Sequence, residues 1–140
     1  MKLLNVAEPM RKRDGSLYLE PKVDERGRVV LEDGEARLSH QIRDSDTVAL
    51  VEVPVGKIMN FALDKASDKL EPVERRKRFG LTLRIQAAMD AGQPMEMDRE
   101  DEKRIEAAAE LITDNHLFLF RVIEAIEQAE LVKKELKAVN

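Results

Sequence analysis

Five carboxylates in one short stretch are the residues best suited to chemistry. Glu96, Asp98, Glu100, Asp101 and Glu102 form the densest group among the 28 acidic residues. Such a group can supply the carboxylate pair of acid–base catalysis, or a Mg²⁺ or Mn²⁺ site in a metal-assisted hydrolase. It lacks the alternating oxygen ligands and the central glycine of a calcium loop. Because Asp98 is a good helix N-cap and carboxylates favour the first helical turn, we interpret the group as structural.

Other reactive side chains are scarce. His40 and His116 lie far apart, and neither belongs to a zinc-binding pattern of paired histidines. The chain has no cysteine, which excludes disulfides, thiolate metal sites and cysteine nucleophiles. No glycine-rich phosphate loop and no nucleophile elbow occurs. We therefore expect no enzyme activity, no catalytic residue, no cofactor and no metal site.

Basic residues form two short runs, at residues 11–13 and 75–78, but no basic stripe. Successive residues of a helix advance by about 100°, so four neighbouring cations point around most of the cylinder and cannot grip one phosphate backbone. The whole chain has 24 basic and 28 acidic residues, a net charge of −4. We therefore expect a solvated face or contact with an acidic protein surface, and we do not expect nucleic-acid binding.

The first 53 residues show the patterns of short strands. Asp33-Gly34 lies between two alternating runs, which predicts a hairpin over residues 28–39 with a two-residue type I′ turn. In that register Leu31 faces Ala36 and Val29 faces Leu38. Residues 47–53 form a second strand candidate, and residues 17–19 are a candidate edge strand. Residues 1–14 have no clear period.

Four helices are predicted from residue 54 onward. Apolar spacings of three and four predict a helix from Pro54 to about Lys69, and a second one from Pro72 to a Gly92 C-cap. In the second helix, Phe79, Leu83 and Ala87 form one apolar row, which Leu81, Ile85, Ala88 and Met89 broaden. A third helix follows Asp98, and Asp114-Asn115 predicts a break before the last helix, residues 116–138.

The last helix carries a long apolar stripe. Its marked positions are Leu119, Val122, Ile126, Ala129, Val132 and Leu136. A stripe of 24 residues is about 36 Å long at 1.5 Å per residue, more than a small core needs. We therefore interpret the stripe as a partner-binding surface or as a site of self-association, and the acidic group at residues 96–102 as a second candidate partner contact.

A recurring order of apolar and charged segments runs through residues 55–130. Its parts are VGKI at residues 55–58 with Ala62 and Leu63, residues 74–79 with Leu83 and Ile85, residues 101–105, and residues 117–127. This order resembles a group of small proteins encoded by tailed bacteriophages. The resemblance implies a phage origin and supplies no active site.

Together these patterns predict one α+β domain over residues 1–140, with a small antiparallel β unit followed by a bundle of three or four helices. With no signal peptide and no membrane span, we expect a host-cytoplasmic protein. The leading hypothesis is a non-enzymatic phage protein that binds another protein, in virion assembly or as an accessory factor. The alternative is an inhibitor of host transcription or of an anti-phage defence complex, with the acidic group mimicking nucleic acid.

Overall fold

The computed structural model describes residues 1–65, 69–112 and 114–139, without side chains for residues 130–139. The helices are α1 (Val55–Lys65), α2 (Pro72–Ala91), α3 (Arg99–Ala109) and α4 (His116–Val139), with a 3₁₀ turn at Ser39–Gln41. The strands are β1 (Lys2–Leu4), β2 (Leu19–Pro21), β3 (Val29–Val30), β4 (Ala36–Arg37), β5 (Leu50–Glu52) and β6 (Met95–Met97). The α+β class predicted from the sequence is confirmed.

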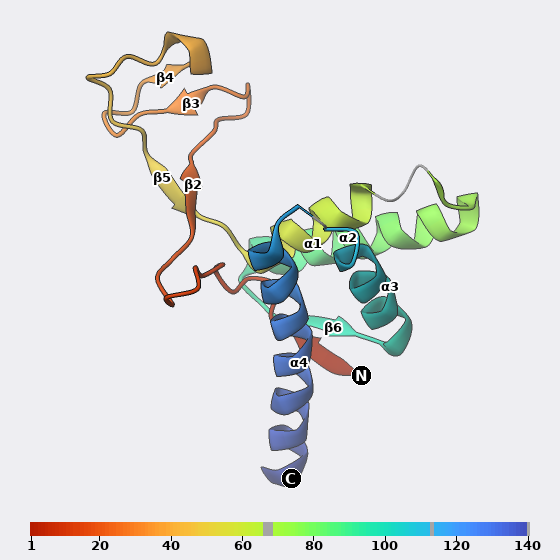
Figure 1. The fold of residues 1–140 in the computed structure, drawn as a ribbon. Helices are drawn as coiled ribbons and strands as arrows, with labels where there is room; N and C mark the ends of the chain where they lie inside the picture. The colour runs from red at the N-terminus through yellow and green to blue at the C-terminus, as the bar shows by residue number, and fades with distance from the viewer. Residues whose placement is uncertain (66–68, 113, 140) are drawn as a thin grey trace.

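The chain is arranged as a helical body and a projecting β arm, which we define as residues 17–52. Figure 1 shows β2 to β5 leading away from the helices, with the β3–β4 hairpin at the far end. Strands β2 and β5 are antiparallel and pair Leu19 with Glu52 and Pro21 with Leu50. At the base of the arm, Tyr18 contacts Phe118 of α4 edge to face, with ring centroids 5.5 Å apart. The arm is therefore attached to the body at one end.

Two strands of the body come from opposite parts of the sequence. The N-terminal β1 pairs with β6, antiparallel, with Leu3 opposite Glu96. No strand is predicted at residues 95–97, because three residues between a helix and a helix cap are too few to show a period. The β elements therefore extend beyond the predicted unit of residues 1–53.

The hairpin turn lies at Asp33-Gly34 as predicted, but its predicted register is wrong by one residue. Val29 pairs with Arg37 rather than Leu38, and Val30 pairs with Ala36. The Leu31 amide donates to the Glu35 carbonyl at 2.7 Å, which encloses a three-residue loop. Within it Gly34 has φ +93°, whereas Asp33 does not have a positive φ. A type I′ turn requires positive φ at both positions, so the loop adopts the three-residue form that ends in a left-handed glycine.

The main core lies among the four helices and the β1–β6 pair. Its buried residues include Leu4 and Val6 from the N-terminal segment, Leu63 from α1 and Val122 from α4. Gly56 allows this close packing, because a Cβ there would lie 2.9 Å from Val6 Cβ and 2.8 Å from Met89 Sδ. Apart from Tyr18 at its base, which packs against this cluster, the arm lies outside it and has its own small apolar centre, at Val29 and Leu31.

The predicted C-cap of α2 and the predicted break before α4 agree with the structure. Gly92 has φ +64° and caps α2, and the break near Asp114 separates α3 from α4. Helix α1 is described over Val55–Lys65, and the predicted stretch from Ala66 toward Lys69 includes residues 66–68, which lie outside the described residues. No helix among the described residues is both long enough and apolar enough to cross a membrane.

The predicted inner face of α2 is correct for Leu81 and Ile85 and wrong for Phe79 and Leu83. Phe79 and Leu83 are 62% and 55% exposed, whereas Leu81 and Ile85 are fully buried. Both rows have helical spacing, so periodicity alone does not distinguish them. The choice is made by α1, where Asn60 donates to the Thr82 carbonyl at 3.2 Å and so helps turn the Leu81 side of α2 inward.

Candidate functional site

The apolar stripe of α4 contributes to the core of this chain. Val122, Ile126 and Ala129 are at most 4% exposed, and Leu119 is half-buried. These side chains pack within the body of this chain, although the stripe is predicted to bind a partner. Val132 and Leu136 lie outside the residues whose side chains the structure describes.

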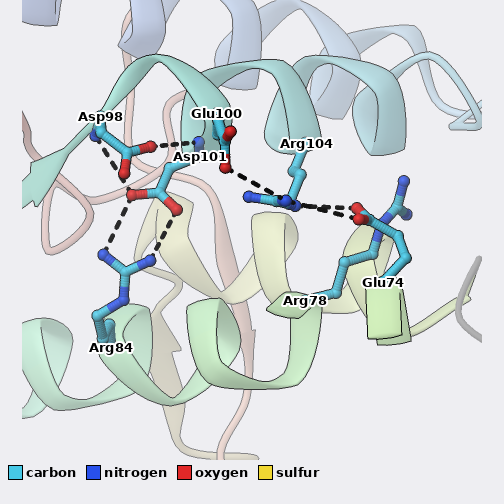
Figure 2. A network of polar contacts seen from close by, with 7 residues as sticks. All are labelled: Glu74, Arg78, Arg84, Asp98, Glu100, Asp101 and Arg104. Atoms are coloured by element: carbon cyan, nitrogen blue, oxygen red, sulfur yellow. Dashed lines mark hydrogen bonds and ion pairs between the residues drawn. The ribbon is translucent and has the colours of Figure 1, made fainter. Parts of the chain in front are cut away.

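The acidic group at the start of α3 forms a helix cap. The Asp98 carboxylate accepts a hydrogen bond from the Asp101 amide at 2.8 Å, and the Asp101 carboxylate accepts one from the Asp98 amide at 3.2 Å. This reciprocal pair satisfies two amides that the first turn leaves without helical partners. Figure 2 shows both carboxylates turned toward each other's backbone. The structural interpretation of Asp98 is therefore confirmed.

Asp101 also ties α3 to α2. Arg84 donates to both oxygens of the Asp101 carboxylate, at 2.7 and 3.1 Å. Burial by itself would raise the pKa of Asp101, but the hydrogen bonds from Arg84 and from the Asp98 amide outweigh it, so the pKa is lowered. Asp101 is thus held as a carboxylate by bonds within the chain.

A second ion cluster also joins α2 and α3, and it lies about one turn further along α3 (Figure 2). Arg104 of α3 donates from Nε to Glu74 of α2 at 2.9 Å, and Glu100 lies 3.6 Å from its Nη2. The Arg104 hydrogen bond is the main cause that lowers the pKa of Glu74. Arg78 approaches the same carboxylate only to 3.7 Å. Its Nε and Nη1 are buried and have no hydrogen-bond partner among the residues that the structure describes, so Arg78 is an incompletely satisfied buried cation.

The remaining carboxylates of the acidic group do not converge. Glu102 forms a salt bridge with Lys2 of β1 at 2.9 Å, and Glu96 is exposed on β6. The group therefore divides among a cap, inter-element ion pairs and solvent. Among the described residues, no three His, Asp or Glu side chains are placed to hold a metal ion. His40 and His116 are exposed on separate elements, and the structure does not bring them together.

A cavity of about 260 Å³ lies between the N-terminal segment and α4. Leu3, Met10 and Val55 contribute to its wall. Arg121, which also lines it, donates to the carbonyls of Arg11 and Lys12 and pairs with Glu124 at 3.0 Å. The guanidinium of the cavity is thus bonded within the chain, and its arrangement does not point to a ligand.

One exposed apolar surface lies on the β arm. Residues directly opposite in an antiparallel pair point to the same face, as do alternate residues of a strand. Leu19, Pro21, Leu50 and Glu52 therefore share one face, which we call the ribbon outer face. All four are exposed, with Leu50 at 56%. The other face bears Glu20, which lies 3.5 Å from Lys57 of α1.

A second exposed apolar surface lies on α2. Phe79, Leu83 and Ala87 recur every four residues on the side opposite Leu81 and Ile85, with Gly80 beside them. We call these four exposed-side residues, Phe79, Gly80, Leu83 and Ala87, the α2 outer face. The apolar spacing of the Phe79 row is visible in the sequence, where it predicts a core position. A helix with two apolar rows and a glycine between them was the available sign of a second contact surface.

The two surfaces differ in charge. Residues 17–52 contain nine acidic and five basic side chains, so the arm has a net charge of −4 and the rest of the chain is neutral. Helix α2 carries five basic and two acidic residues. Arg75 and Arg76 are exposed next to Phe79, and neither makes a salt bridge with any residue that the structure describes.

Comparison of the chain with protein-family models, with curated proteins and with solved structures gave no match.

Proposed function

We propose that this protein acts by binding another protein chain rather than by catalysis. The observation that carries the proposal is the pair of exposed apolar surfaces on ordered elements, the ribbon outer face and the α2 outer face. Large apolar side chains scattered singly over a surface are ordinary, whereas grouped ones on one face are typical of contact sites. Phe79 and Leu83 lie one turn apart on α2, and Leu19 and Leu50 lie on one face of a two-stranded ribbon.

The β arm adds a second reason to favour binding. A two-stranded hairpin alone is marginally stable in water, and its outer edges leave backbone amides and carbonyls unpaired. Figure 1 shows the β2–β5 pair standing apart from the helices, where a partner can reach it. A contact on the ribbon outer face would stabilise the arm and remove its apolar side chains from water.

The polar clusters support the same proposal. The ionisable groups that approach one another most closely in α2 and α3 bond to each other and to helix amides. Such bonds hold helices together, and they leave these groups less able to transfer protons to a substrate. The resemblance to phage proteins suggests virion assembly or an accessory role as the setting, and this remains part of the proposal.

The alternative proposal, a host-directed inhibitor with a nucleic-acid-mimicking patch, has less support from the geometry. It needs several free carboxylates on one surface, whereas Asp101 and Glu102 are paired with basic residues. Glu96 and Glu100 are the exposed members that can test it, and Glu100 also lies 3.6 Å from Arg104 Nη2. If replacing both by Gln abolished an inhibitory effect on host cells, this alternative would replace the leading one.

Site-specific photocrosslinking tests the leading proposal. A photoreactive residue is placed at Leu50, at Leu83 or at Leu111, which is 49% exposed but lies outside both surfaces. In cells that express the chain from its native gene, we expect the photoreactive residue at position 50 or 83 to crosslink one discrete protein. The same residue at position 111 should not do so. Equal, diffuse crosslinking at all three positions would refute the proposal.

A further inference from the structure

We propose that the partner is a second copy of this chain, with the ribbon outer face of one copy packed against the α2 outer face of the other. The inference rests on the proposed function and specifies its occupant. Both surfaces belong to the same chain, so each copy offers one of each. The contact joins unlike faces, and its geometry decides whether the copies close into a ring or extend into a chain.

The two faces match in size and in chemistry. Three residues of a strand span about 10 Å, and the eight steps from Phe79 to Ala87 on α2 span about 12 Å. Leu19 and Leu50 on the ribbon would meet Phe79 and Leu83 on the helix. A helix laid on a β ribbon is a common way to bury an apolar sheet face.

Net charge favours the contact of the arm with α2 over a contact of two arms or of two α2 helices. The arm has a net charge of −4 and α2 has a net charge of +3. An arm on an arm, or an α2 on an α2, brings like charges together, whereas an arm on α2 brings opposite charges together. Locally, Glu52 is on the ribbon outer face, and Arg75 and Arg76 are beside Phe79 at the start of the α2 outer face. The apolar residues of the arm therefore have an acidic neighbour, and those of α2 have basic neighbours.

Gly80 is the third observation. A glycine inside a helix costs about 1 kcal/mol relative to alanine. A Cβ at Gly80 would meet no atom within 4 Å, so packing within the chain does not account for this residue. Gly80 lies on the same side of α2 as Leu83 and Ala87. A missing side chain there allows the backbone of a second copy to approach α2 closely.

Sedimentation of the full chain and of two variants tests the contact. Leu50→Asp disables the ribbon outer face, and Leu83→Asp disables the α2 outer face. We expect the wild-type chain to self-associate as its concentration rises. Each variant alone should associate roughly ten- to a hundredfold more weakly, because a leucine leaves the contact and a charge enters it. Leu111→Asp is the matched control and should associate like the wild type.

Mixing the two variants separates the possible pairings. The intact arm of Leu83→Asp can still bind the intact α2 of Leu50→Asp, so the mixture should regain association that neither variant has alone. In an arm–arm contact, Leu83→Asp would associate by itself. In an α2–α2 contact, Leu50→Asp would do so. Either of these results, or a mixture that stays monomeric, overturns the proposal.

Gly80→Leu should change self-association without lowering the stability of the single chain. The change adds a good helix former at a position with free space, so the melting temperature should not fall. Self-association should weaken at least about tenfold, because the side chain fills the approach to α2. A variant that associates like the wild type would contradict the close approach.

The same measurements keep the two proposals apart. A wild-type chain that remains monomeric at every concentration overturns the second-copy inference. The proposed function then still stands if the Leu50 or Leu83 crosslinker captures a different protein. If crosslinking at both positions is no more specific than at Leu111, the proposed function itself fails.

Discussion

Arg78→Met is expected to stabilise the protein, although it removes a charged residue from an ion cluster. Arg78 is 8% exposed, and its Nε and Nη1 are buried without hydrogen-bond partners. Each buried N–H left unpaired costs about 1–3 kcal/mol. Methionine keeps an unbranched apolar stem of similar reach and has no N–H group to satisfy.

The opposing contribution is the attraction between Arg78 and Glu74. At the 3.7 Å separation of Nε and Oε1, Coulomb's law with an effective dielectric constant of 20 gives about 4 kcal/mol. This is an upper bound, because the Glu74 side chain is 33% exposed and already accepts a hydrogen bond from Arg104. Replacing incompletely paired buried ions by apolar residues is often stabilising. We expect a net gain of about 1–2 kcal/mol, which corresponds to a rise in Tm of about 3–7 °C for a chain of 140 residues.

Arg104→Met is the matched control, because it removes a guanidinium from the same carboxylate. Arg104 donates to both oxygens of Glu74, at 2.9 and 3.5 Å. Its loss leaves Glu74 with only the distant Arg78, so we expect a destabilisation of about 1–3 kcal/mol. Urea unfolding followed by circular dichroism measures both changes. If Arg78→Met lowers the free energy of unfolding as much as Arg104→Met does, the reasoning about unpaired N–H groups is refuted.

Three further predictions concern packing, capping and pH. Gly56→Ala should lower the free energy of unfolding by about 1–3 kcal/mol, because its Cβ would overlap Val6 and Met89, whereas Gly80→Ala should raise it by about 0.5–1 kcal/mol; equal effects in urea unfolding would contradict this packing. Asp98→Ala should cost about 1 kcal/mol by removing the α3 cap, and an unchanged urea midpoint would show that the cap contributes nothing. Acid should destabilise the fold through Asp101 and Glu74, whose pKa values are lowered in the folded chain: their stabilisation is complete above the unfolded pKa values of about 4 and is lost as the pH falls through the folded values. In Asp101→Asn the loss of stability between neutral and acid pH should be smaller, and an identical pH dependence would count against it.

Local signals in the sequence were sufficient for the helix ends. Asp98 caps α3 and Gly92 caps α2, since each of these contacts involves residues within a few positions of each other. Such interactions depend little on the rest of the fold, so residue type and spacing predict them.

Pairings between distant residues were not predictable in the same way. The β1–β6 pair joins residues about 90 positions apart, and neither three-residue strand carries a period of its own. The hairpin register depended on whether Asp33 took a positive φ, which a sequence pattern does not fix. These features depend on tertiary packing, which overrides weak local preference.

The α2 helix shows why the sequence pattern placed the Phe79 row in the core. Its two apolar rows are equivalent in spacing, and Phe79 is the one aromatic residue of the helix. Contacts with α1 determine which row is buried, because Gly56 and Asn60 of α1 lie against the Leu81 side of α2. Which of the two apolar rows stays exposed can therefore be determined only when the elements that pack against α2 are known.

The exposed apolar row of α2 and the apolar stripe of α4 differ in their surroundings. On α4 the part of the stripe from Val122 to Ala129 is buried within the body. On α2 the Phe79 row remains exposed after the Leu81 row has filled the space against α1, and cations adjoin it. Arg75 and Arg76 would not be needed for the solubility of a chain that is already charged. In the proposed contact their place beside Phe79 would favour an acidic partner, and the arm of the same chain is acidic. If raising the salt concentration leaves the self-association unchanged, the contact is apolar alone and this preference plays no part in it.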